Sequence, residues 1–116
     1  MSGDAPTRDL AELAERIRAF ASSRDWEQYH TPKNLAMALS VEVAELLEPF
    51  QWLTAEEAQS LRDDPARLAD LESELADVAI YLVRLADVLG VDLSEAIHRK
   101  MGVNAGRFPV IHDRVD

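Results

Sequence analysis

The sequence predicts an all-α domain, and three patterns lead to that prediction. Apolar residues recur at helical spacing along several segments, residues typical of helix caps precede those segments, and no segment alternates with the period of two that a strand requires. At 116 residues, the chain is long enough for one modest core and too short for two. We therefore expect residues 1–116 to form a single domain, with residues 1–6 and 111–116 flexible.

The first predicted helix is amphipathic. From about residue 7 to residue 23, apolar side chains recur at i, i+3, i+4 and i+7. The stretch at residues 22–30 breaks this period and is expected to be a loop. It carries side chains that could contact a ligand, namely Trp26, Tyr29 and His30.

The second predicted helix has a start and a stop signal. Thr31 is a good N-cap, and Pro32 is favoured at the first helical position. We expect this helix to extend to about Glu48, where Pro49 ends or bends it. An aromatic turn that contains Trp52 follows directly.

Capping signals predict two further helices in the middle of the chain. Thr54 and Glu57 have the spacing of a capping box, which predicts a short helix at about 55–62. Asp64 is followed by proline, and this pair begins the longest predicted helix, at about 65–89.

A last helix and an irregular tail complete the chain. Gly90 supplies a stop for the long helix, and Asp92 with Glu95 begins the next one. We expect the last helix to fray between residues 102 and 106, and the tail from residue 107 to be irregular.

The long helix is apolar nearly all the way round between residues 75 and 89. A small monomer cannot bury every side of such a helix, so part of it should contact another subunit. We therefore expect an oligomer.

Composition excludes several classes of function. The net charge of −10 argues against a nucleic-acid-binding surface, although a nucleotide could bind if a metal ion supplied positive charge. The lack of cysteine excludes disulfides, zinc–thiolate sites and cysteine nucleophiles. No signal-peptide-like or membrane-spanning stretch is present, so we expect a cytoplasmic protein with neither a membrane nor a nucleic-acid polymer as partner.

Two pairs of carboxylates lie in the middle of otherwise apolar helices. Glu42 and Glu45 form one pair, Glu74 and Asp77 form the other, and the i, i+3 spacing places each pair on one helical face. If the helices pack antiparallel, the pairs can face each other. Like charges brought together in a low-dielectric site need a cation between them, and all-oxygen ligands suit Mg²⁺ or Mn²⁺.

Other interpretations of these acids remain open. They could lie on solvated faces, or they could pair with basic side chains, of which only Lys33 and Arg84 are near in sequence. Redox iron is disfavoured because di-iron bundles use Glu-x-x-His, and no His follows here. Glu48 extends the first acidic series and is either a further ligand or an exposed residue.

Further side chains could contact a nucleotide. Tyr81 is four residues after Asp77, so it shares the metal-facing side of the helix, unless it is a core tyrosine. Lys100 and Asn104 share one face of the last helix with Arg107 close behind, and they could bind phosphates or lie free on the surface. Trp26 and Trp52 could stack on a base or fill the core.

These residues together resemble the all-α nucleoside triphosphate pyrophosphatases, the MazG-like superfamily. The signature is Glu42-x-x-Glu45 followed by Glu74-x-x-Asp77. The similarity is greatest to the dCTP pyrophosphatases and covers roughly residues 24 to 110, in the stretches RDWEQYHTPKNLAMAL, EVAELLEPFQW, ELADVAIYLVRLADVLGVDL and KMGVNAGRFPV.

The resemblance implies a fold and an activity. The fold is an antiparallel four-helix core completed by oligomerisation, tetrameric in the dCTP pyrophosphatase branch. The activity is Mg²⁺-dependent hydrolysis of a (deoxy)nucleoside triphosphate, with dCTP or a modified dCTP as substrate, to the monophosphate and pyrophosphate. The rival expectation is a non-catalytic helical oligomer, an interaction protein whose acids are structural.

The resemblance also implies roles for individual residues. Ile17 departs from the family pattern, because animal dCTP pyrophosphatases have a pocket histidine there, and this permits a more apolar or less selective base pocket. The implied metal ligands are Glu42, Glu45, Glu74 and Asp77, with Glu42 or Glu45 as the general base; the implied phosphate ligands are Lys100, Asn104 and Arg107; and the implied nucleoside contacts are Trp26, His30, Trp52 and Tyr81.

Overall fold

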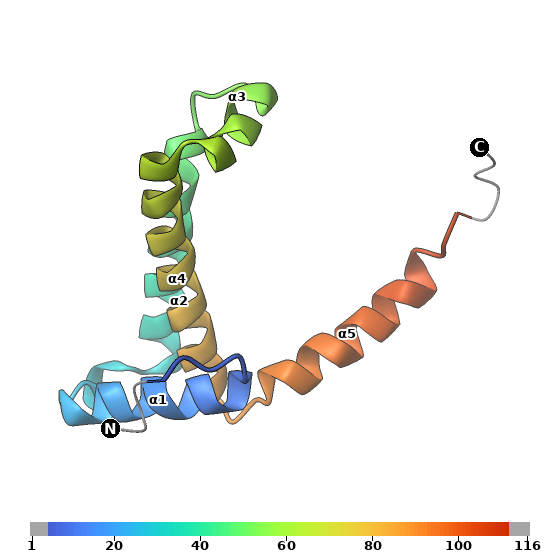
Figure 1. The fold of residues 1–116 in the computed structure, drawn as a ribbon. Coiled ribbons are helices and arrows are strands. Elements are labelled where there is room, and N and C mark those ends of the chain that lie inside the picture. Colours follow the sequence, from blue (N-terminus) through green and yellow to red (C-terminus); the bar gives the residue numbers. More distant parts are fainter. Residues whose placement is uncertain (1–4, 112–116) are drawn as a thin grey trace.

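A computed structural model describes residues 5–111, and within that range the chain is helical with no strand (Figure 1). This confirms the predicted all-α class. The expected flexible ends fall largely on residues 1–4 and 112–116, which lie outside the described residues. The α-helices are α1 (Leu10–Ser23), α2 (Pro32–Leu47), α3 (Ala55–Gln59), α4 (Pro65–Val88) and α5 (Leu93–Arg107), with short 3₁₀ helices at Glu27–Tyr29, Glu48–Phe50 and Ser60–Asp63.

Side-chain caps determine where the helices begin. The carboxylate of Asp9 accepts hydrogen bonds from the backbone N–H groups of Ala11 and Glu12, so α1 begins at Leu10 and not at residue 7. Each such cap is worth about 1 kcal/mol because it satisfies a backbone donor that the helix leaves free. The four later helices begin at their predicted caps, which are Thr31, Thr54, Asp64 and Asp92.

The capping box at α3 is complete. The Thr54 N–H donates to Glu57 Oε1 at 2.8 Å, and the Glu57 N–H donates to Thr54 Oγ1 at 3.1 Å. The α-helix is shorter than predicted because the chain tightens into the 3₁₀ helix Ser60–Asp63, which delivers Leu61 to the core.

The C-terminal helix differs from the prediction in its extent. It continues to Arg107 through Gly102 and Gly106, where fraying was expected. A glycine costs a helix about 1 kcal/mol relative to alanine, but its backbone adopts helical angles freely. Gly90, by contrast, has a φ of +71° after the end of α4, which is the left-handed conformation expected of a helix stop.

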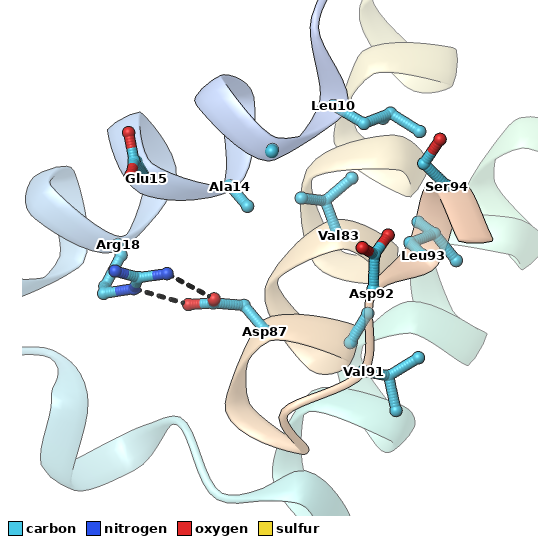
Figure 2. Close-up of a pocket in the computed structure, with 12 residues that line it drawn as sticks. Leu10, Ala14, Glu15, Arg18, Val83, Asp87, Val91, Asp92, Leu93 and Ser94 are labelled. Carbon is cyan, nitrogen blue, oxygen red and sulfur yellow. Dashed lines mark hydrogen bonds and ion pairs between the residues drawn. The ribbon is translucent and has the colours of Figure 1, made fainter. Parts of the chain in front are cut away.

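Helices α2 and α4 pack side by side along most of their lengths and run antiparallel (Figure 1). Helix α1 crosses one end of this pair and α3 lies at the other end, while α5 starts near α1 and projects away (Figure 1). A cavity of about 240 Å³ lies where α1, α4 and the start of α5 meet, and the ion pair between Arg18 and Asp87 lines it (Figure 2).

The chain buries little of its apolar surface. Its accessible area is 9309 Å², whereas a compact protein of this mass exposes roughly 6,300 Å². Its radius of gyration is 17.9 Å, against roughly 13 Å for a compact domain of this length. None of the helices within residues 5–111 has the length and apolarity that crossing a bilayer demands. The buried apolar residues are Ala21, Leu35, Leu61, Leu71, Val83 and Ala86.

Candidate functional site

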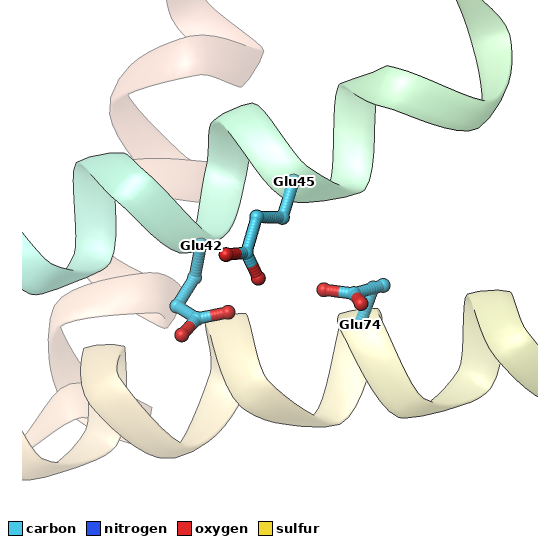
Figure 3. A group of neighbouring side chains, drawn as sticks. All are labelled: Glu42, Glu45 and Glu74. Carbon is cyan, nitrogen blue, oxygen red and sulfur yellow. The ribbon is translucent and has the colours of Figure 1, made fainter.

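Three of the four predicted metal ligands converge between α2 and α4. Glu42 and Glu45 extend from α2 toward Glu74 on α4 (Figure 3). Carboxylate oxygens from the three residues all lie within 4.8 Å of one another. The i, i+3 spacing directs the two α2 acids to one face, and the antiparallel pairing of the helices brings that face onto α4.

The three acids, here named the carboxylate cluster, lack compensating partners. Oε2 of Glu42 and Oε2 of Glu74 are buried and accept no hydrogen bond from the described residues. Within residues 5–111, no Arg or Lys forms an ion pair with these acids or with Asp77. An uncompensated buried carboxylate oxygen is costly, so the pairing with basic side chains that the sequence left open does not account for the cluster.

The electrostatics show how crowded these charges are. Burial raises the pKa of Glu42, and the nearby carboxylates of Glu45, Asp77 and Glu74 raise it further. Burial likewise raises the pKa of Glu74, and Glu45 and Asp77 are the next largest causes. Both carboxyl groups are therefore harder to ionise than a free glutamate, and a nearby cation would favour their ionised forms.

Asp77 lies next to the carboxylate cluster rather than within the group of three. It lines a cavity of about 420 Å³, the nucleoside-sized cavity, formed by α1, the loop before α2, and α4. Its charge raises the pKa of both Glu42 and Glu74, which places it within electrostatic reach of them. The cavity is lined by Arg16, Ile17, Phe20, Ala21, Trp26, His30, Asp77, Ile80, Tyr81 and Arg84.

The walls of this cavity are largely aromatic and aliphatic. Trp26 meets Phe20 edge to face with ring centroids 5.7 Å apart, and its ring is 6.1 Å from that of His30. Edge-to-face and tilted aromatic contacts of this kind hold the rings in place. Among the predicted nucleoside contacts, Trp26, His30 and Tyr81 thus share one cavity, together with Ile17.

The remaining predicted contacts lie elsewhere in the subunit. Trp52 is 85% exposed and lines a different cavity, beside Leu53, Leu61 and Leu71. The three predicted phosphate ligands are on α5, which projects away from the α2–α4 pair, and they line neither the carboxylate cluster nor the nucleoside-sized cavity; they are Lys100, Asn104 and Arg107.

Comparison with known proteins shows the family of this chain. Residues 37–115 match the sequence profile of the MazG-like family. The chain belongs to the MazG-like family. It is 45% identical to mouse dCTP pyrophosphatase 1 over 105 residues, which is 90% of this chain and 62% of that protein, and 50% identical to the bovine protein over 101 residues, or 87% of this chain and 60% of that protein. The chain therefore spans about three fifths of the length of these curated relatives.

A solved structure is similar over nearly its whole length. A pyrophosphatase from Archaeoglobus fulgidus superposes with a TM-score of 0.77 at 44% identity, covering 91% of this chain and 97% of that one. The MazG-like fold that the sequence resemblance implied is thereby confirmed.

Two polar residues that line the nucleoside-sized cavity, Arg16 and Arg84, were not identified as site residues from the sequence. Arg84 is only 5% exposed, and its Nε–H donates to Nδ1 of His30 at 3.0 Å. A signal was present, because Asp77, Tyr81 and Arg84 are spaced i, i+4 and i+7 and so share a face of α4. Phe20 also lines the cavity, and its place in the apolar period of the first predicted helix gave no sign of this role.

Proposed function

We propose that this protein is a metal-dependent nucleotide pyrophosphohydrolase, which converts a (deoxy)nucleoside triphosphate to the monophosphate and pyrophosphate. One observation carries the proposal: a carboxylate cluster with two buried, unpartnered oxygens and no ion pair within the described residues lies beside a cavity large enough for a nucleoside. The names of the relatives, dCTP pyrophosphatase 1 and a pyrophosphatase, support it. The proposed substrate is dCTP or a modified dCTP.

The carboxylate cluster suits a hard divalent cation. Its donors are all oxygen, two of its buried oxygens have no protein partner within the described residues, and Mg²⁺ or Mn²⁺ prefers such ligands. Glu42, Glu45 and Glu74 would hold the ion, with Asp77 as the fourth ligand. When bound, Mg²⁺ supplies the positive charge that a triphosphate needs and lowers the pKa of a coordinated water.

The chain's own groups perform the proton transfer and the positioning. Glu42 or Glu45 accepts a proton from the water that attacks the α-phosphorus. The new bond joins that water oxygen to phosphorus, and the bond from phosphorus to the bridging oxygen breaks, so that pyrophosphate leaves in line. No covalent intermediate with the protein is required.

The nucleoside-sized cavity would hold the base and sugar. Trp26 offers a ring face for stacking, and His30 and Tyr81 supply the polar contacts. Ile17, where animal dCTP pyrophosphatases carry a histidine, makes this cavity more apolar. We therefore infer that modified or several bases are accepted besides cytosine.

The phosphate ligands would come from another copy of the chain in a homotetramer. Helix α5 projects away from its own carboxylate cluster, and its exposed apolar side chains include Ile97, Met101 and Val103. The subunit also exposes roughly 3,000 Å² more than a compact protein of its mass, which is an area that an obligate interface could cover. Lys100, Asn104 and Arg107 of one copy would then bind the phosphates held by another.

The expected cytoplasmic location stays a prediction, supported by the lack of cysteine.

The test is a screen of deoxynucleoside and nucleoside triphosphates for pyrophosphate release, with and without Mg²⁺. We expect release that requires Mg²⁺, with a cytosine nucleotide among the best substrates. The exposed apolar faces also fit the alternative of a non-catalytic helical interaction protein. That alternative predicts no release from any nucleotide and no effect of Mg²⁺ on melting.

A further inference from the structure

His30 and Arg84 form a polar contact that the proposed reaction does not use. Arg84 lies on α4, is 5% exposed, and donates from Nε to Nδ1 of His30, in the loop before α2, at 3.0 Å. Its Nη1–H donates to Oδ2 of Asp87 at 3.1 Å. Asp87 also accepts two hydrogen bonds from Arg18 on α1 (Figure 2). Asp87 on α4 and His30 in the loop therefore hold the Arg84 guanidinium in one orientation, and Arg18 fixes the carboxylate.

This contact determines which nitrogen of His30 carries the proton. A guanidinium has five N–H donors and no acceptor, so the nitrogen that faces it must present a lone pair. That nitrogen is Nδ1. A neutral imidazole has one ring proton, and here it must be on Nε2.

The imidazole is also held in its neutral form. Burial lowers the pKa of His30, and the positive charge of Arg84 lowers it further. At neutral pH the ring therefore has one donor, the Nε2–H, and one acceptor already engaged by Arg84.

We propose that Arg84 is a positioning residue that fixes His30 in the Nε2–H tautomer and so makes it a hydrogen-bond donor in the nucleoside-sized cavity. The ligand chemistry that this donor selects is a base edge bearing an acceptor, either a carbonyl oxygen or a ring nitrogen without hydrogen. The selection of a base rests on the proposed function, whereas the tautomer does not.

The tautomer is tested on the protein without nucleotide. Long-range ¹⁵N–¹H correlation spectra distinguish the two neutral tautomers from the imidazolium, and the His30→Gln variant assigns the signal among the three histidines. We expect His30 to be protonated on Nε2 alone in the wild type, and to show tautomer exchange in Arg84→Met. A wild-type signal from the Nδ1–H form, or from the imidazolium at neutral pH, would overturn the proposal.

The donor role is tested by substitutions that place an amide at one or the other nitrogen position. A glutamine amide reaches about as far as Nε2, while an asparagine amide reaches only about as far as Nδ1. For dCTP we expect His30→Gln to keep most of kcat/KM, and His30→Asn and His30→Phe to lose about tenfold, mainly through KM, as for one neutral hydrogen bond. Equal losses in all three variants would show that no donor is needed at this position.

A double-mutant cycle tests whether Arg84 acts through His30. In a His30→Phe background, Arg84→Met should cause no further loss of kcat/KM, whereas independent roles would give losses that multiply. If Arg84→Met does not fold, the His30 variants and the wild-type spectrum still decide whether His30 is an Nε2–H donor, because His30 is in a loop and its variants should fold. If no nucleotide is hydrolysed, the proposed function fails, and the spectrum alone judges the tautomer.

Discussion

Arg18 on α1 donates two hydrogen bonds to the carboxylate of Asp87 on α4, from Nε at 2.9 Å and from Nη2 at 2.6 Å. Arg84 donates to the same carboxylate, so one acid pairs with two guanidinium groups, one of them buried. This arrangement fixes α1 against the long helix beside the cavity in Figure 2. The pKa of Asp87 is lowered, first by the hydrogen bonds from Arg18.

Replacing this carboxylate should destabilise the fold in a pH-dependent way. Because the pKa of Asp87 is lower in the folded state, the stabilisation is present above the ordinary pKa of 3.8. It is lost as the pH falls through the pKa of the folded state. We expect Asp87→Asn to cost about 3 kcal/mol in the free energy of unfolding near neutral pH, because Arg84 is left buried without a charge partner. Chemical denaturation at several pH values measures this.

The control for that measurement is Asp63→Asn, because Asp63 is exposed in a 3₁₀ helix. Its free energy of unfolding should stay within about 0.5 kcal/mol of the wild type. A destabilisation by Asp87→Asn that is the same at every pH would contradict the role of the ionised carboxylate.

Removing one charge from the carboxylate cluster should abolish turnover. We expect Glu45→Gln to lose pyrophosphate release with Mg²⁺ present while its circular dichroism spectrum stays helical, because Glu45 is exposed and supports no core packing. The matched control is Glu72→Gln, an exposed acid on α4 that is not in the cluster. Full turnover in Glu45→Gln would remove the basis for the proposed chemistry.

Metal should stabilise the fold through Glu74. Because the pKa of Glu74 is raised by burial, its contribution to stability is present below its ordinary pKa and is lost as pH rises through the folded value. Without metal near neutral pH, Glu74→Gln should therefore melt at a higher temperature than the wild type. Added Mg²⁺ should raise the wild-type melting temperature, because at a hundredfold excess over its dissociation constant it adds about 2.7 kcal/mol to the free energy of unfolding. It should have little effect on the variant. Equal responses to Mg²⁺ would place the ion elsewhere.

The apolar face of α5 should hold the oligomer together. Met101 is 62% exposed in the isolated subunit, and an aspartate there would place a charge in the proposed interface. We expect Met101→Asp to shift the sedimentation equilibrium from tetramer toward smaller species and to lower turnover in parallel. Glu56→Gln on α3, away from α5, is the control. A wild-type protein that sediments as a monomer would contradict the assembly.

Local features of this fold could be predicted from the sequence because their causes are local. Thr31, Asp64 and Asp92 each cap the helix that begins one residue later, and the interaction spans three residues. The i, i+3 pair Glu42 and Glu45 could be placed on one face for the same reason.

Features that depend on distant contacts could not be predicted. The direction of α5 depends on the turn at Gly90 and on the contacts of α5 with α1 and α4, and no sequence period encodes those contacts. Arg84 and His30 are 54 residues apart, and their contact exists only because the loop before α2 folds onto α4. Asp77 shares spacing with Glu74, yet it lines the neighbouring cavity, since the packing of the helices decides which side chains converge.

Because α5 projects outward, the specific activity of the enzyme should depend on the protein concentration. A single copy of the chain would keep the carboxylate cluster and the nucleoside-sized cavity. It would lack the Lys100 and Arg107 side chains of a second copy, which would bind the pyrophosphate leaving group. Specific activity should then fall on dilution and recover on concentration, so the hydrolytic rate would rise more steeply than in proportion to copy number. A modest change in the amount of protein synthesised would thereby cause a larger change in the rate of hydrolysis.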